Sequence, residues 1–535
     1  MERQCGTCNQ PFQFSDQEKT FYEKISPVLA NRKYLIPDAK HCPDCRQKRR
    51  LRFRNGLNLY GRRCDACQKD IIAVYPKDTS YPVYCPECWW GDKWDALHYQ
   101  ISWNDLSPFE NIKTLLQTVP VLSLINTNSE NSTYAHDAEN NKNCYLVFSS
   151  IGSQDSMYMV DSNKMRNSLD AYWSIDCELC YEIISCSECY QTAYSTHSYR
   201  INFSYFCDFC GNCNNCFGCF HLSNKEYHIF NQPYSKEEYE AKIAVYKKRM
   251  ETWAGCEEVK KEVAAFFATQ PHPASILTLC ENSTGDFLVH SKNCHECYNV
   301  VDSEDGGYLY DCVAMKDAYD CNLTYRSELM YNCQSCLGQN TICSSFSSNC
   351  SNIMYCDHCF NCNNCFGSVG LRHQEYCIFN KQYSKEAYEQ LVPRLIQKMI
   401  ESNQWGEFFP SDLSPITLTD SVVHSHFPLL EQKNIQVIIT ENAASTVTPF
   451  GPKTNCVACH KDFLMIKQEL AFYQKQGLPL PAICYACRQQ RRIEERNPRH
   501  LIKRNCAYCE QLTLSTYPTT DTTIIYCEKC YQNRD

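Results

Sequence analysis

Sixteen of the 41 cysteines form eight CxxC pairs near the two ends of the chain. A CxxC turn presents two thiolates from one tight loop, and two such turns complete the tetrahedral set of four sulfur ligands that structural zinc prefers. The pairs therefore predict about four Zn²⁺ ions, one in each of these sets: Cys5, Cys8, Cys42 and Cys45; Cys64, Cys67, Cys85 and Cys88; Cys456, Cys459, Cys484 and Cys487; Cys506, Cys509, Cys527 and Cys530.

The spacing of these pairs is the same at both ends. Eighteen residues separate the two sets of each end (46–63 and 488–505), and seventeen lie inside the second set (68–84 and 510–526). Only the first loop differs in length. The ends are therefore duplicates of one device. Buried free thiols are the alternative, and four complete sets make zinc the favoured interpretation.

Aromatic residues follow each first pair at fixed places. The strings CGTCNQPF…TFY…CPDCR and CVACHKDF…AFY…CYACR share the pattern C-x2-C-x3-F…F-Y…C-x2-C-R. This pattern resembles the "probable zinc-ribbon" family. The layout is similar to large uncharacterised cysteine-rich proteins of uncultured small-genome bacteria, whose middle regions carry NCFGC strings like the one at 215–219. The resemblance implies zinc and no particular activity. Each unit should be treble-clef-like, with a knuckle, a hairpin and a helix on the second knuckle.

The middle of the chain is a tandem duplication, in which residues 131–243 align with 282–392. Aromatic residues recur about every 12 residues, and each opens a short strand-like stretch that a polar turn follows. Self-similarity at a short period is typical of solenoids, in which equivalent side chains stack. We therefore expect a parallel β-solenoid with two such segments in each rung of about 23 residues. A meander of small antiparallel sheets is the alternative.

The string FCDFCGNCNNCFGCF at 206–220 places a cysteine at every third residue, and YCDHCFNCNNCF repeats most of it. A bacterial ferredoxin needs a three-residue gap and a proline that both strings lack. Cysteine also exchanges with serine between the copies, as at Cys312 and Ser162, which suits packing as a small inward residue. A further metal site is the alternative, and three histidines lie near the two strings: His221, His358 and His373.

The chain carries a net charge of −9 but has two basic stretches. Residues 40–63 hold nine Lys/Arg and one acid, and residues 488–504 hold seven and two, so the remainder carries −9 − 8 − 5 = −22. On a helix, arginines spaced by 3, 4 and 8 share one face, which suits nucleic-acid phosphates. These are Arg46, Arg49, Arg50, Arg54, Arg488, Arg491, Arg492 and Arg496. A solvated face, or a clamp onto the acidic middle, is the alternative.

Two function classes follow from these features. The first is a nucleic-acid-binding protein, with RNA slightly favoured; the second is a protein-interaction scaffold built on the repeats. An enzyme is not expected, because HExxH, Walker A and GxGxxG motifs are missing and four thiolates leave no open metal position. No secretory signal or membrane span of about 18–20 apolar residues is visible, so a soluble cytoplasmic protein is expected. That reducing compartment favours metal over disulfides.

Together these features predict a mainly β fold with short helices. Zinc ribbons at 1–60, 61–105, 456–500 and 501–535 flank a cysteine- and tyrosine-rich β-solenoid-like middle. Its two copies, 131–250 and 282–403, each end in a helix, and a connector at 404–455 follows. The first of these helices should begin at Ser235, which forms a capping box with Glu238.

Overall fold

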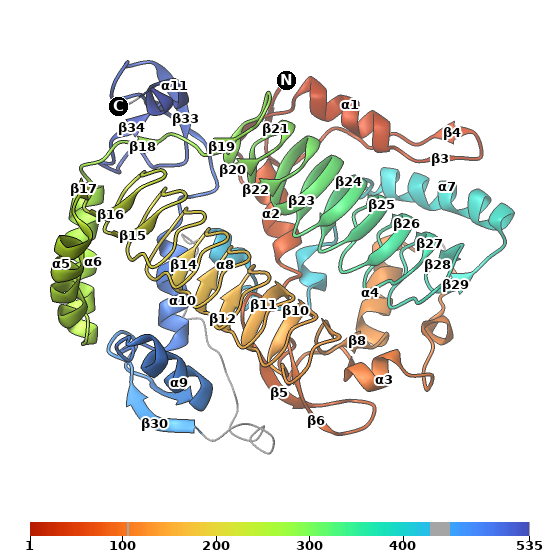
Figure 1. The fold of residues 1–535 in the computed structure, drawn as a ribbon. Helices are drawn as coiled ribbons and strands as arrows, with labels where there is room; N and C mark the ends of the chain where they lie inside the picture. Colours follow the sequence, from red (N-terminus) through yellow and green to blue (C-terminus); the bar gives the residue numbers. More distant parts are fainter. Residues whose placement is uncertain (104–105, 428–449, 534–535) are drawn as a thin grey trace.

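The computed structural model describes residues 1–103, 106–427 and 450–533. Two stacks of short parallel strands lie side by side, with small hairpins and helices around them (Figure 1). The first stack contains β9 (Asn126–Thr127), β10 (Ala135–Glu139), β11 (Tyr145–Ile151), β12 (Met157–Val160), β13 (Leu169–Tyr172), β14 (Tyr181–Ile184), β15 (Asn214–Phe217) and β16 (Glu226–Ile229). The second contains β19 (Leu277–Thr278), β20 (Gly285–Val289), β21 (Lys292–His295), β22 (Cys297–Val301), β23 (Glu304–Asn322), β24 (Tyr325–Gln334), β25 (Leu337–Ile342), β26 (Ser348–Met354), β27 (Asn363–Phe366) and β28 (Cys377–Ile378).

Each turn of a stack contains about twelve residues. Met157 pairs in parallel with Tyr145 and with Leu169, which lie twelve residues before and after it. Bridges between single residues continue this spacing through the part of the first stack that lacks regular strands. The predicted rung of about 23 residues is therefore wrong, because one 12-residue segment already closes a turn. The parallel order of the strands also contradicts the antiparallel meander.

Left-handed residues bend the chain at regular intervals. In the first stack Asn143, Leu146, Ser149, Gly152 and Asp155 all have φ between 49° and 68°, and the series continues at every third residue. Left-handed backbone costs most residues about 1–2 kcal/mol, and Asn, Asp and Gly tolerate it best. Polar residues predicted to form turns, such as Asn143 and Asp155, therefore stand at corners, but apolar residues such as Leu146 occupy corners as well.

The residue after each corner points into the stack. In the first stack Cys207, Cys210, Cys213 and Cys216 are four such residues in succession, and none is more than 1% exposed. Cys210 Sγ donates a hydrogen bond to the carbonyl of Asp208, at 3.4 Å. The structure thus packs these cysteines inside, as small side chains with a weak donor, which agrees with the interpretation favoured from the sequence.

Serines share the interior with the cysteines because each supplies a hydrogen-bond acceptor. The Ser168 hydroxyl donates to the carbonyl of Arg166 at 2.9 Å and accepts from the backbone N–H of Cys180 at 3.1 Å, one turn further on. The Ser174 hydroxyl accepts from the N–H of Cys186 in the same way. A buried N–H needs such a partner. The narrow interior therefore selects small residues that carry a hydroxyl or a thiol.

Helices cover the end of each stack. The first stack is followed by a hairpin with β17 (Gln232–Pro233) and then by α5 (Lys236–Arg249) and α6 (Trp253–Phe267); the second is followed by β29 (Lys381–Gln382) and α7 (Lys385–Glu401). The capping box between Ser235 and Glu238 is present. Tyr239 and Ile243 pack with Phe217 of the stack, so α5 covers the last turns of the first stack.

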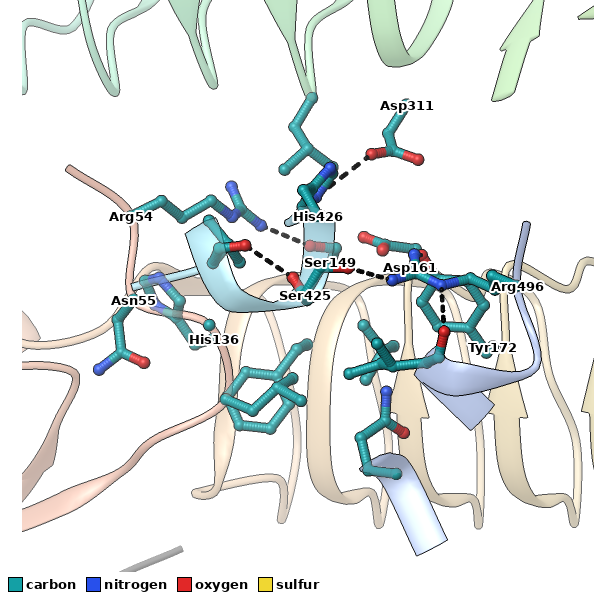
Figure 2. A pocket seen from close by; sticks show the side chains of 18 residues that line it. Arg54, Asn55, His136, Ser149, Asp161, Tyr172, Asp311, Ser425, His426 and Arg496 are labelled. Atoms are coloured by element: carbon teal, nitrogen blue, oxygen red, sulfur yellow. Dashed lines mark hydrogen bonds and ion pairs between the residues drawn. The ribbon is translucent and has the colours of Figure 1, made fainter. Parts of the chain in front are cut away.

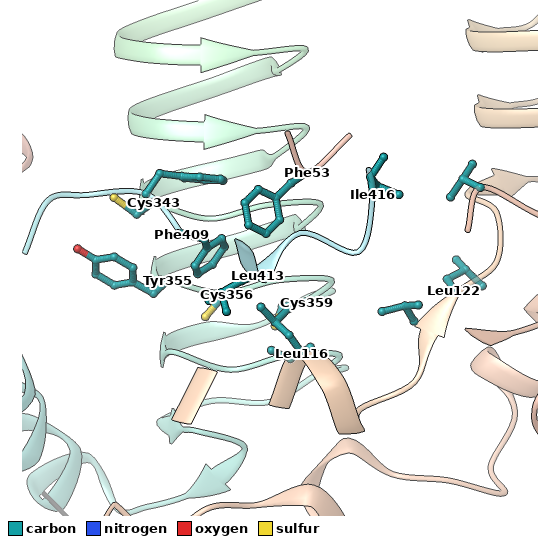
Figure 3. Close-up of a cluster of buried hydrophobic side chains, with 14 of the residues drawn as sticks. Phe53, Leu116, Leu122, Cys343, Tyr355, Cys356, Cys359, Phe409, Leu413 and Ile416 are labelled. Atoms are coloured by element: carbon teal, nitrogen blue, oxygen red, sulfur yellow. The ribbon is translucent and has the colours of Figure 1, made fainter. Parts of the chain in front are cut away.

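Part of the predicted connector at 404–455 belongs to the core. Phe409, Leu413 and Ile416 pack beside Phe53 and Tyr355, between the N-terminal hairpins and the second stack (Figure 3). This segment includes a 3-10 turn at Ser411–Leu413 and the short α8 (Val423–His426). Residues 428–449 of the connector lie outside the described residues. Within the described ranges, no helix has both the length and the apolar character that crossing a bilayer would require.

Candidate metal centres and arginine clamps

Each terminal cysteine set sits on a hairpin and a helix. In the first set, the turn between β1 (Glu2–Gln4) and β2 (Pro11–Gln13) carries Cys5 and Cys8, and Cys42 is the N-cap residue of α2 (Pro43–Leu51). This is the expected order of knuckle, hairpin and helix. The other sets use β5 (Tyr60–Arg63), β6 (Asp70–Ala73) and α3 (Pro86–Trp90); β30 (Phe450–Asn455), β31 (Asp462–Ile466) and α10 (Tyr485–Glu494); and β32 (Ile502–Asn505), β33 (Leu512–Ser515) and α11 (Glu528–Gln532).

The four predicted sets are also the four sets that the structure brings together. In each, the four Sγ atoms lie within 4.8 Å of one another. Neighbouring sulfurs are 3.7 Å apart between Cys8 and Cys42, and 3.8 Å apart between Cys459 and Cys484. Across residues 1–103, 106–427 and 450–533, these are the only groups of three or more ligating side chains this close together. The cysteines inside the stacks form no such group.

Backbone N–H groups point at one sulfur of each set. The N–H groups of Thr7 and Cys42 donate to Cys5 Sγ at 3.4 and 3.2 Å. Burial opposes ionisation of this thiol, but the backbone donors outweigh it and lower the pKa of Cys5 to about 5. The same balance lowers the pKa of Cys456 and of Cys506 to about 6. Since a metal binds the thiolate, these donors prepare the site for a cation.

Comparison with known proteins places the chain in no family. No protein-family model matches it, and no curated protein matches it. Among solved structures, one similar chain is named "putative acetyltransferase from Desulfovibrio desulfuricans G20"; it is 10% identical, and the match covers 52% of this chain and 82% of that one with a TM-score of 0.10. The cysteine clusters implied by the resemblance to zinc ribbons are present, whereas membership of that family stays a prediction.

The helix that follows the first metal set is fixed to the second stack by its arginines. Asp320 of β23 accepts from Arg46 Nε at 3.0 Å and from Arg50 Nη1 at 3.2 Å. Arg46 also pairs with Glu18 of α1 (Asp16–Ile25), at 3.0 Å. All four side chains are at most 6% exposed. The carboxylates and the guanidinium groups therefore neutralise one another inside the protein.

The third metal set is fixed to the first stack in the same way. Asp170 accepts from Arg488 Nε at 2.7 Å and from Arg492 Nη2 at 2.8 Å. Arg488 also pairs at 3.1 Å with Glu469 of α9 (Lys467–Gln476). Each end of the chain thus docks on the stack that is more distant in sequence. The arginine clamp is duplicated together with the cysteines.

These contacts correct the predicted nucleic-acid surface. Of its eight arginines, Arg46, Arg50, Arg54, Arg488 and Arg492 are buried. The other three are partly exposed and have partners: Arg49 pairs with Glu407 at 2.6 Å, Arg491 pairs with Glu257 at 2.9 Å, and Arg496 donates to the Tyr172 hydroxyl. The exposed basic face required by that prediction is not present on these helices. The clamp onto the acidic middle, which the sequence left open, is what the structure shows.

A small polar cavity of about 40 Å³ lies between the two stacks (Figure 2). Arg54 spans the gap: it pairs with Asp137 of the first stack at 2.8 Å and donates to Ser335 of the second. Asp161 and Asp311 both line the cavity, and burial together with the Asp311 carboxylate raises the pKa of Asp161 to about 7. A space of this size holds a few water molecules and no organic substrate.

Sequence reasoning missed the acidic half of each clamp. Asp170 and Asp320 are corner residues with φ of 59° and 56°, in a chain where many corners carry Asp or Asn. Nothing local distinguishes them from exposed corner residues. The available signal was their separation of 150 residues, which equals the offset of the tandem copies.

Proposed function

We propose that the protein is a non-catalytic scaffold in which four zinc-binding modules hold two β-solenoids together. One observation carries this proposal: the cysteine that closes a metal set is followed directly by the arginine that docks on a stack. Cys45 precedes Arg46, and Cys487 precedes Arg488. Cys45 and Cys487, when they hold a metal, would fix the first turn of α2 and of α10 and thereby orient both clamps.

Zinc fits the donor sets better than other metals do. Four cysteine sulfurs in a closed tetrahedral arrangement are typical of structural zinc, and small modules of this kind fold when the metal binds. Cys5, Cys8, Cys42 and Cys45 would hold the first ion, and the other three sets would hold one each. Because all four positions are cysteine, no site is left for a substrate, and the role of the metal is structural.

The burial and pairing of the clamp arginines favour a scaffold over nucleic-acid binding. The buried guanidinium groups of both clamps already pair with carboxylates, so they are not available to phosphates. A repeat architecture, in contrast, offers long surfaces to partners.

The test is metal content combined with metal removal. The purified protein should contain about four zinc ions, as measured by mass spectrometry of the metals. Removal with a strong chelator should expose the α2 and α10 segments to limited proteolysis before the stacks are cleaved, because the stacks contain none of these ligands. Fewer than three zinc ions, or iron with a visible charge-transfer band, would contradict the proposal.

Binding assays separate the scaffold from the alternative. Gel shifts with structured RNA, single-stranded RNA and duplex DNA at low salt should show no complex. A complex that weakens when Arg49 and Arg491, the least buried arginines of the two clamp helices, are changed to glutamine would return nucleic-acid binding to first place.

A further inference from the structure

Two adjoining sides of the first stack carry exposed aromatic side chains. Tyr190, Tyr199 and Phe203 are 38%, 47% and 45% exposed. The rings of Tyr190 and Phe203 meet edge to face, with centroids 5.5 Å apart. A solvent-facing group of large aromatics is unusual on a protein surface and marks a binding site more often than a solvated face. We name these three residues the aromatic patch.

Tyr199 lies flat on the sheet. It pairs with Gly211 one turn further on, and a Cβ atom added to that glycine would stand 2.3 Å from the Tyr199 ring. The ring therefore covers the glycine, while the Tyr199 side chain is still 47% exposed. A glycine at this position is what allows the ring to lie down. The Tyr199 ring is therefore a rigid aromatic platform. Because the ring is already ordered, binding of a ligand does not cost its side-chain entropy.

A surface hollow of about 250 Å³ continues from the patch along the stack. Its polar lining comes from successive turns: Lys164 and Arg166, then Asp176 and Glu178, then Glu188. Tyr190 belongs to both the hollow and the patch. A linear ligand laid along the axis of the stack would therefore touch the polar side chains first and Tyr190 next, with Tyr199 on the adjoining side.

The charges of this surface cancel. Lys164, Arg166 and Arg200 carry three positive charges, and Asp176, Glu178 and Glu188 carry three negative ones. Arg200 is moreover paired with Glu188 at 2.8 Å. A groove that binds nucleic acid needs an excess of positive charge to hold phosphates, and this surface has none. A neutral ligand rich in hydroxyl groups meets no such requirement.

We propose that this face of the first stack binds an uncharged polysaccharide. The electron-rich face of an aromatic ring attracts the weakly positive C–H groups on the flat side of a sugar ring. Carboxylates accept hydrogen bonds from sugar hydroxyls, while arginine and lysine donate to sugar oxygens. The aromatic patch and the hollow supply both kinds of contact over successive turns of the stack, which fits an extended chain of sugars.

The test uses the full-length, metal-loaded protein and a panel of neutral polysaccharides: cellulose and chitin in pull-downs, and xylan, β-glucan and dextran in affinity gel electrophoresis. At least one glycan should be retained, and Tyr199→Ala should weaken binding at least fivefold. Gly211→Ala keeps Tyr199 but forces its ring off the sheet, so it should weaken binding by a similar factor. Tyr508→Ala, which removes an exposed tyrosine of the fourth metal module, is the matched control.

Each outcome decides the question, provided that zinc content and circular dichroism show the variants to be folded. Retention of a glycan that both platform variants lose, and the control keeps, supports the proposal. Retention of none of the glycans, or equal retention by all variants, overturns it. Binding of single-stranded RNA that depends on Tyr199 would also overturn it, because the ring would then stack on bases.

Discussion

Asp170 and Asp320 lie 150 residues apart and hold the two arginine clamps. Each is a left-handed corner residue of one stack, and each accepts from two arginines of a helix that begins at a metal ligand. The symmetry extends to the helices before them, where Glu18 pairs with Arg46 as Glu469 pairs with Arg488. The first metal module is thereby held on the second stack, and the third metal module is held on the first stack.

Replacing either aspartate should destabilise the protein strongly. Asp170→Asn or Asp320→Asn leaves two buried guanidinium groups short of a carboxylate, and breaking a buried pair in this way costs about 3–5 kcal/mol. Chemical unfolding of the zinc-loaded protein measures the loss. Asp302→Asn is the matched control, since Asp302 is also a left-handed corner residue but is 57% exposed. If Asp170→Asn and Asp320→Asn lower the free energy of unfolding no more than Asp302→Asn does, the clamps do not hold the fold.

Cysteines of the two kinds should differ in their effect on metal content. Cys8→Ser should remove one zinc ion per chain, because Cys8 belongs to the first set. Cys207→Ser combined with Cys210→Ser should keep all the zinc and cost little stability, since Ser195 and Ser198 stand at the equivalent positions one turn earlier with their hydroxyls hydrogen-bonded to backbone carbonyls. Loss of an ion in the double variant would show that the stack does bind metal.

The inward-facing serines that accept from a backbone N–H one turn further on, here called the serine ladder, make a separate prediction. Ser168→Ala removes the acceptor of the Cys180 N–H and should cost about 1–3 kcal/mol, the penalty of a buried unpaired group. Ser168→Cys should cost less, because a thiol can replace the hydroxyl: Cys350 Sγ accepts from the N–H of Cys362 at 3.4 Å. Ser187→Ala, at a half-buried position outside the ladder, is the control. Equal costs for the two alanine variants would contradict this account of the interior.

The metal sets could be read from the sequence, because a CxxC knuckle is a local motif and its spacing is repeated. The 12-residue period is also visible in the sequence, in the spacing of the aromatic residues, but that spacing does not show that one such segment closes a whole turn. Cysteine also recurs at every third residue in 206–220, whereas the side chains of a strand normally alternate with a period of two. A period of three appears because a left-handed corner follows every two other residues.

The role of the arginines depended on long-range contacts that composition does not reveal. A run such as CRQKRRLRFRN has the same appearance whether it meets phosphate, solvent or a buried carboxylate. The partner of Arg50 is Asp320, which lies 270 residues away and resembles many other corner aspartates. The duplication shows that two similar ends accompany two similar repeats, but it does not show which end docks on which repeat.

The cavity between the stacks should make stability depend on pH through Asp161. Burial and the Asp311 carboxylate raise the pKa of Asp161 from 3.8 to about 7, against the opposing effect of Arg54 and Arg499. Between these values the folded chain keeps a proton that the unfolded chain has lost, so this group makes the free energy of unfolding fall as pH rises, and its effect is constant above pH 7.

Asp161→Asn cannot ionise and removes this dependence. Relative to the natural protein, the variant should gain stability steadily from about pH 4 to pH 7, by at most about 4 kcal/mol, and no further above pH 7. Urea unfolding of both proteins at several pH values measures the difference, with Asp302→Asn as the exposed reference. Titrating groups that do not contact Asp161 are shared by the two proteins and cancel in the comparison. A difference that stays flat across this range would mean that Asp161 is ionised in the folded protein and that the arginines outweigh its burial.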